Sequence, residues 1–137
     1  MQDYIERLIA ARGEELQTVA RRMARHGNDA ISAVDRLLNS RDRHLRLAAT
    51  MVLSHVSHPR AVAGLIHALG DEDNLVRLQA AVGLGQYKTR QARNALLSAF
   101  PDRLPSISIA LLRSMENMIT PEMVQALQAM DGQQLAP

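Results

Sequence analysis

The chain repeats itself with a period of 31 residues, and this repeat limits what it can fold into. The segments HLRLAA at 44–49 and LVRLQA at 75–80 place Arg46 and Arg77 at matching positions. Under the same shift Leu53 meets Leu84, and a second shift sends Leu84 to Met115. Apolar positions survive the shift whereas surface positions vary. This pattern indicates one structural unit stacked on copies of itself.

Each unit contains two helical patterns. Leu45, Ala49 and Leu53 are spaced i, i+4 and i+8, which places them on one face of a helix, and the next unit repeats the spacing at 76, 80 and 84. The chain has neither alternating β-branched runs nor Asn-Gly hairpin signals, so we expect no strands. Breakers and apolar spacing predict helices near residues 2–12, 14–26, 29–39, 42–55, 59–69, 73–85, 89–99, 105–118 and 121–131.

The segment 69–85, LGDEDNLVRLQAAVGLG, resembles the short HEAT repeat, the bacterial form also called PBS-lyase HEAT-like. It contains a leucine, a small acidic turn, Val-Arg, a helix of small residues and Leu-Gly. The preceding unit has Ser54 in place of the glycine, and the third has Ser108 in place of the arginine. The resemblance covers about residues 30–131. It implies an all-α fold, an α-solenoid or superhelix of stacked antiparallel helix pairs with about four repeats.

The length of 137 residues fits one domain. We expect a single solenoid over 1–131, with capping helices at 1–28, repeats at 29–131 and a flexible tail at 132–137. No apolar run approaches the roughly 18 residues of a spanning helix, so we expect no membrane insertion. The first residues carry acids and no apolar run, which does not fit a secretory signal. The chain has no cysteine, which fits the cytoplasm, and the resemblance adds a bacterial setting.

The resemblance also implies a structural role for the repeated arginines. Arg46 and Arg77 are expected to bridge neighbouring repeats through their acidic turns, with Asp42, Asp71 and Asp73 as the available acceptors. A buried ion pair of this kind can fix the register of a stack without adding net stability.

The most distinctive feature is a set of apolar residues at positions where this repeat is usually indifferent. Residue 47 lies about 200° around the helix from residue 45, so it is expected to point away from the core. In a solenoid the second helices of the pairs line the concave surface. We call this set the apolar ladder; it consists of Leu47, Met51, Leu78, Val82 and Ile109.

Contiguous exposed apolar surface often marks an interaction site. We therefore hypothesise that the apolar ladder forms a groove for an amphipathic helix or extended peptide of another protein, with His44, Arg43 and Arg113 as its polar rim. The alternative is that these side chains pack against neighbouring inner helices or a chain terminus. A second apolar face, on the helix near 121–131, has Met123, Val124, Leu127 and Met130 and is a candidate edge for a homo-oligomer.

Two other classes of function remain as alternatives. Arginines cluster at 21–25 and 41–46 and are candidates for nucleic-acid binding, but the net charge of only +2 and the scarcity of aromatic residues argue against it. A bilin lyase-like or tetrapyrrole chaperone role follows only by family analogy, and no residue here would carry it.

Catalysis and metal binding lack the residues they need. The chain has no Gly-x-Ser-x-Gly nucleophile motif and no His-Glu pair. His44 and His55 share a helical face but lie roughly 16 Å apart along it, too far to bind one ion. We therefore expect no enzyme activity, no metal and no cofactor.

Overall fold

The computed structural model describes residues 1–116, 121, 124–125 and 128–129. Throughout residues 1–116 the regular elements are helical, which confirms the predicted all-α solenoid. The expected helix near 121–131 lies largely outside the described residues, and the expected tail at 132–137 lies wholly outside them. The elements are α1 (Gln2–Ala10), α2 (Gly13–Ala24), α3 (Asn28–Val34), η1 (Asp35–Asn39), α4 (Arg43–His55), α5 (Ala61–Ala68), α6 (Asn74–Leu84), α7 (Arg90–Ala99) and α8 (Pro105–Met115).

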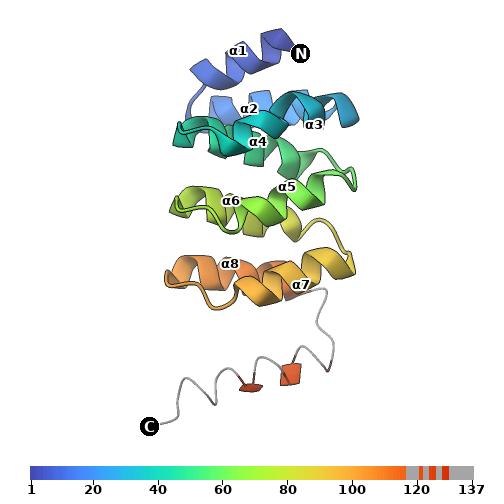
Figure 1. The fold of residues 1–137 in the computed structure, drawn as a ribbon, viewed down its shortest axis with the longest axis vertical. Coiled ribbons are helices and arrows are strands. Elements are labelled where there is room, and N and C mark those ends of the chain that lie inside the picture. The colour runs from blue at the N-terminus through green and yellow to red at the C-terminus, as the bar shows by residue number, and fades with distance from the viewer. Residues whose placement is uncertain (117–120, 122–123, 126–127, 130–137) are drawn as a thin grey trace.

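The helix pairs follow one another along the molecule's long axis, so that their helices form two layers side by side (Figure 1). One layer contains α2, α4, α6 and α8, each packed on the next, and the other contains α3 with η1, α5 and α7. Counting α1 with α2, the described part holds four helix pairs, in agreement with the expected number of repeats.

The helix starts explain why the turns recur. Asp42 accepts a hydrogen bond from the His44 backbone N–H at 2.8 Å, and Asp73 accepts one from the Leu75 N–H at 2.9 Å. These side-chain caps satisfy N–H groups that have no partner within the helix. In the third copy α8 begins instead with Pro105 in its first turn, where the missing N–H costs nothing.

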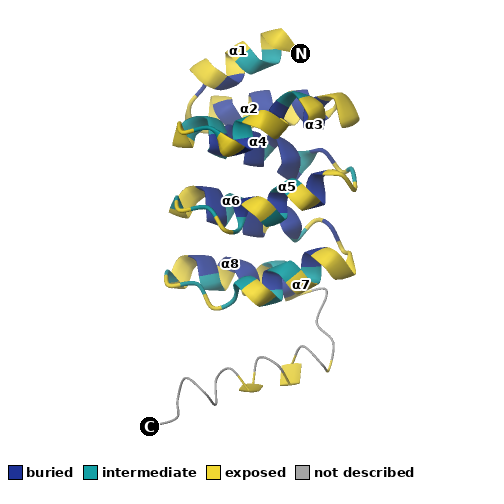
Figure 2. Cartoon of the chain, in the orientation of Figure 1, coloured by how far each residue is buried: buried dark blue, intermediate teal, exposed yellow. Residues whose placement is uncertain are grey.

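Small side chains let the inner helices approach closely. Each helix buries the face that it turns toward its neighbours (Figure 2). Ala49 and Ala80 are fully buried between the layers. A Cβ added at Gly83 would lie 2.3 Å from the Ser54 Oγ, so only glycine fits where α6 meets α4. Gly85 directly follows α6, and its φ of −61° is right-handed. Close packing against Ser114 explains why this position holds a glycine.

The predicted helix at 29–39 is two elements. The α-helix ends at Val34 and continues as the 3-10 helix η1, which ends at Asn39. Such turns often close helices because i to i+3 bonds satisfy the last carbonyls. Leu38 remains buried at the end of this segment.

Candidate partner-binding surface

The apolar ladder lies on α4, α6 and α8, and its members differ in exposure. Val82 and Ile109 are 48% and 50% exposed, which is high for large apolar side chains. Leu78 and Met51 are half-buried against the main core. Leu47 is half-buried against a smaller apolar cluster that includes Val76 and Ala80. The exposed part of the ladder is therefore concentrated on α6 and α8.

A groove runs between α6 and α8, and we call it the α6–α8 groove. Four sequence-predicted site residues meet there, namely Leu78, Val82, Ile109 and Arg113. The cavity has a volume of about 520 Å³. The remaining lining residues, which sequence reasoning missed, are Gly85, Gln86, Ser106, Ala110 and Ser114. Helical spacing could have found two of them, because Ser106 stands three residues before Ile109 and Ala110 stands three residues before Arg113.

Arg43 and His44 were expected to form part of the polar rim of the groove, but they contact other parts of the chain. Arg43 Nε lies 3.0 Å from Asp73 Oδ2, so this cation is already paired with the next repeat. The His44 ring Nε2 lies 2.8 Å from the Leu8 carbonyl oxygen and 2.9 Å from Arg12 Nη1. His44 thus contacts the end of α1, which the sequence pattern did not predict. Of the three rim residues, only Arg113 lines the α6–α8 groove.

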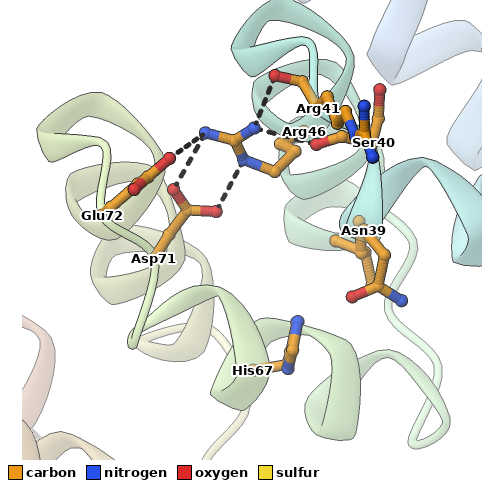
Figure 3. Close-up of a pocket in the computed structure, with 8 residues that line it drawn as sticks. Asn39, Ser40, Arg41, Arg46, His67, Asp71 and Glu72 are labelled. Atoms are coloured by element: carbon orange, nitrogen blue, oxygen red, sulfur yellow. Dashed lines mark hydrogen bonds and ion pairs between the residues drawn. The ribbon is translucent and has the colours of Figure 1, made fainter.

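The repeated arginines join neighbouring units by the same geometry, and we call these contacts the arginine joints. Arg46 Nε lies 3.0 Å from Asp71 Oδ2, while its Nη1 donates to the Ser40 and Arg41 carbonyls at 2.8 and 3.2 Å. Figure 3 shows Arg46 pointing across to Asp71 and Glu72 of the next unit. Glu72, 3.8 Å away, is almost fully exposed.

The second arginine joint repeats the first at a shift of 31 residues. Arg77 Nε lies 3.0 Å from Asp102 Oδ1, and its Nη1 donates to the Asp71 and Glu72 carbonyls at 2.9 and 3.2 Å. Asp102 was not among the acceptors expected from sequence, although it stands 31 residues after Asp71. Asp42 and Asp73, which were among them, cap α4 and α6 instead of accepting from Arg46 or Arg77.

The cavity beside the first arginine joint measures about 480 Å³ and includes Arg46, His67 and Asp71 in its lining. Figure 3 draws these side chains together with Asn39, Ser40 and Arg41. The charged groups that face each other there are paired with one another, as the distances above establish. The arrangement therefore accounts for a structural contact between repeats.

Among the described residues, three groups have shifted pKa values. Burial acts to raise the pKa of Asp102, but hydrogen bonds from the Leu104 N–H and Arg77 and the charges of Arg77 and Arg103 outweigh it, and the net pKa is lowered. Burial lowers the pKa of His55, and the nearby Arg21 charge adds to the effect. Burial raises the pKa of Tyr87, whose hydroxyl donates to the Leu53 carbonyl at 2.9 Å.

Other kinds of site find little support in the part of the chain that the structure describes. Within it, no three His, Asp or Glu side chains are grouped to hold a metal ion. No described helix is both long and apolar enough to cross a membrane. Among the N-terminal arginines proposed for nucleic acid, Arg46 is buried in an arginine joint and Arg43 is paired with Asp73, whereas those on α2 are exposed.

Comparison with known proteins agrees with the geometry. The family model described as HEAT repeats matches residues 4–82 and again residues 62–133. No curated protein matches the chain. The two matched segments together span nearly the whole sequence, and they include both arginine joints and the α6–α8 groove. From its repeat, its stacked helix pairs and this match, the chain belongs to the HEAT repeat family.

Proposed function

We propose that this chain is a non-catalytic binding module that holds a helix or peptide of a partner protein against the layer of α4, α6 and α8. HEAT repeats generally mediate protein–protein interaction, and their scaffolds are generally non-catalytic. The observation that carries the proposal is the exposure of Val82 and Ile109 on facing sides of one groove. Contiguous exposed apolar surface often marks an interaction site.

The walls of the groove suit a helical ligand. They are formed by α6 and α8, and Leu78 and Val82 lie one turn apart on the α6 wall. A third helix can lay an apolar stripe along such a groove, with anchors spaced i, i+3 or i+4 and i+7. Leu78 and Ala110 supply the apolar floor between the two exposed anchors.

A display library of amphipathic helical peptides tests the proposal, with leucine fixed on one face and the other positions randomised. Selection on the full chain is expected to enrich binders. Val82→Asp and Ile109→Asp are expected to abolish that enrichment, because a carboxylate placed in the groove must be desolvated when an apolar face docks.

Ile9→Asp is the matched control, since Ile9 is equally exposed but lies on α1, away from the groove. Circular dichroism is expected to give all three variants wild-type helicity. Equal enrichment on the groove variants and on wild type would rule out the α6–α8 groove as the binding site.

A further inference from the structure

Among the described residues that line the α6–α8 groove, one is ionisable, and it is a cation. The apolar lining residues of the groove are Leu78, Val82, Ile109 and Ala110, and its polar lining residues Gln86, Ser106 and Ser114 are uncharged. Ser114 already donates to the Ala81 carbonyl at 2.6 Å. Arg113 is therefore the one formal charge that a docked partner would meet in the groove.

In the part of the chain that the structure describes, Arg113 lacks the carboxylate pairing that Arg43, Arg46 and Arg77 have. Arg46 and Arg77 each contact a carboxylate at 3.0 Å, and Arg43 contacts Asp73 at the same distance. Within the described residues Arg113 has no carboxylate within 4.0 Å. Glu116, one turn further along, is not part of the groove lining. A ligand carboxylate would thus meet an exposed guanidinium that no described acid neutralises.

The helix directions fix where that carboxylate would stand. The arginine joints tie the turns that precede α4, α6 and α8, so these helices all begin at one edge of the molecule (Figure 1). Arg113 lies in the last turn of α8. The carboxyl ends of α6 and α8, with their partial negative charge, therefore lie together at the Arg113 end of the groove.

We propose that the α6–α8 groove binds an amphipathic helix of another protein, antiparallel to α6 and α8, with an acidic residue in its first turn paired to Arg113. This inference rests on the function proposed above. The antiparallel direction brings the positive amino end of the partner helix to the negative ends of α6 and α8. Acidic side chains are themselves favoured in the first turn of a helix, so the pairing needs no unusual partner sequence.

The test is the same peptide library, selected in parallel on the full wild-type chain and on Arg113→Glu. Wild type is expected to enrich Asp or Glu at a first-turn position, and Arg113→Glu is expected to enrich Lys or Arg at that position. For one selected peptide, replacing the acid by Gln is expected to weaken binding to wild type about two- to five-fold in fluorescence anisotropy, the range of an exposed ion pair. The same replacement is expected to leave binding to Arg113→Gln unchanged.

The outcomes separate this inference from the proposed function. Enrichment that depends on Val82 and Ile109 but shows no acidic preference overturns the pairing with Arg113 and leaves the groove as a binding site. No enrichment on any version of the chain overturns both.

Two other occupants have distinct signatures. A wild-type dimer that Ile109→Asp converts to a monomer in light scattering assigns the groove to a second copy of the chain and overturns the inference. A rise in peptide affinity on Val124→Asp assigns it to the chain's own C-terminal segment and also overturns it.

Discussion

Arginines of similar appearance contribute differently because their surroundings differ. The side chains of Arg77 and Asp102 are 7% and 13% exposed, whereas the Arg43 side chain that pairs with Asp73 is 62% exposed. An exposed pair is screened by water and contributes little, but a buried charge that loses its partner is strongly destabilising. Burial, more than the number of ion pairs, therefore decides which residues hold the stack together.

Arg77→Met is expected to lower the free energy of unfolding by about 3–5 kcal/mol, because it leaves the Asp102 carboxylate buried without its cation. Urea denaturation followed by circular dichroism measures the loss. The control is Arg43→Met, which is expected to cost less than about 1 kcal/mol. Equal losses in the two variants would contradict the assigned role of burial.

Leu78 and Val82 lie one turn apart on α6 and provide a second comparison. Leu78→Asp is expected to cost about 1–3 kcal/mol, because the new carboxylate enters a half-buried site against the core. Val82→Asp is expected to change stability by no more than about 0.5 kcal/mol, because its side chain already faces solvent. Thermal unfolding compares the two, and a larger loss for Val82→Asp would show that Val82 belongs to the core.

The lowered pKa of His55 makes part of the stability depend on pH. The folded chain resists protonation more than the unfolded chain does, so the unfolded state takes up the proton first as the pH falls below about 6.5. Stability is therefore full above that pH and declines as the pH drops through the folded-state pKa. His55→Gln is expected to reduce this decline, measured by urea unfolding at about pH 7.5 and about pH 5. If wild type and His55→Gln lost the same stability between these two pH values, His55 would not be the cause of the decline.

At the scale of helices, close approach depends on particular small residues. Both Gly83 and Gly85 lie where α6 meets a serine of a neighbouring helix, Ser54 of α4 and Ser114 of α8. Alanine would normally be preferred to glycine within a helix, by up to about 1 kcal/mol. Here the neighbouring serine occupies the space that a methyl group would need, so packing outweighs propensity.

Gly83→Ala is expected to destabilise the protein by about 1–3 kcal/mol, because the added Cβ overlaps Ser54 and the helices must separate. Gly70→Ala is the matched control, since its nearest neighbour is the His67 carbonyl oxygen at an ordinary 3.6 Å. Denaturant unfolding distinguishes them. If Gly83→Ala were more stable than wild type, the contact between α4 and α6 would have space for an added methyl group.

The helices were largely predictable, because the residues that determine each helix lie within its own segment. The spacing of Leu45, Ala49 and Leu53 and the capping aspartates lie within single segments, and the observed starts and ends follow the predicted ones closely. The contact of His44 with Leu8 depends on how α1 folds back across 36 residues, which no local pattern encodes. The same holds for Tyr87, which reaches the Leu53 carbonyl from another repeat.

In the whole molecule, the two arginine joints link three successive units. Ser108 occupies the place of the arginine in the third copy, and its hydroxyl donates to the Asp102 carbonyl within its own turn at 3.0 Å. The series of joints thus stops at Asp102 within the described residues. Because each unit contacts only its neighbours, stability is shared locally along the stack.

Breaking one joint is therefore expected to loosen one end of the molecule. In Arg77→Met, amide hydrogen exchange is expected to rise most in α7 and α8 and least in α2 and α4, because the lost contact lies between these groups. Mass spectrometry of peptic fragments measures the distribution. A uniform rise across all helices would indicate that the stack unfolds as one cooperative unit.

The candidate site was less predictable than the fold, because it depends on how neighbouring units pack against one another. The period identified Val82 and Ile109 as residues outside the core, and both are exposed. It could not foresee that Leu47, Met51 and Leu78 are half-buried, because that depends on how closely neighbouring units pack. The packing between neighbouring units arises from many small contacts, which the pattern of a single repeat does not determine.

The two arginine joints match in their main contacts. This match has a consequence for how repeats can be gained or lost in evolution. Arg46 and Arg77 each bind a carboxylate 25 residues ahead, and the Nη1 of each donates to two carbonyls of the turn before its own helix. An unequal crossover between coding segments that removes one 31-residue unit would bring Arg46 to Asp102, a partner of equivalent geometry. Gene duplication would likewise insert a unit whose two faces already match. Repeats can thereby be added or removed while every remaining pair of neighbouring units keeps an arginine joint.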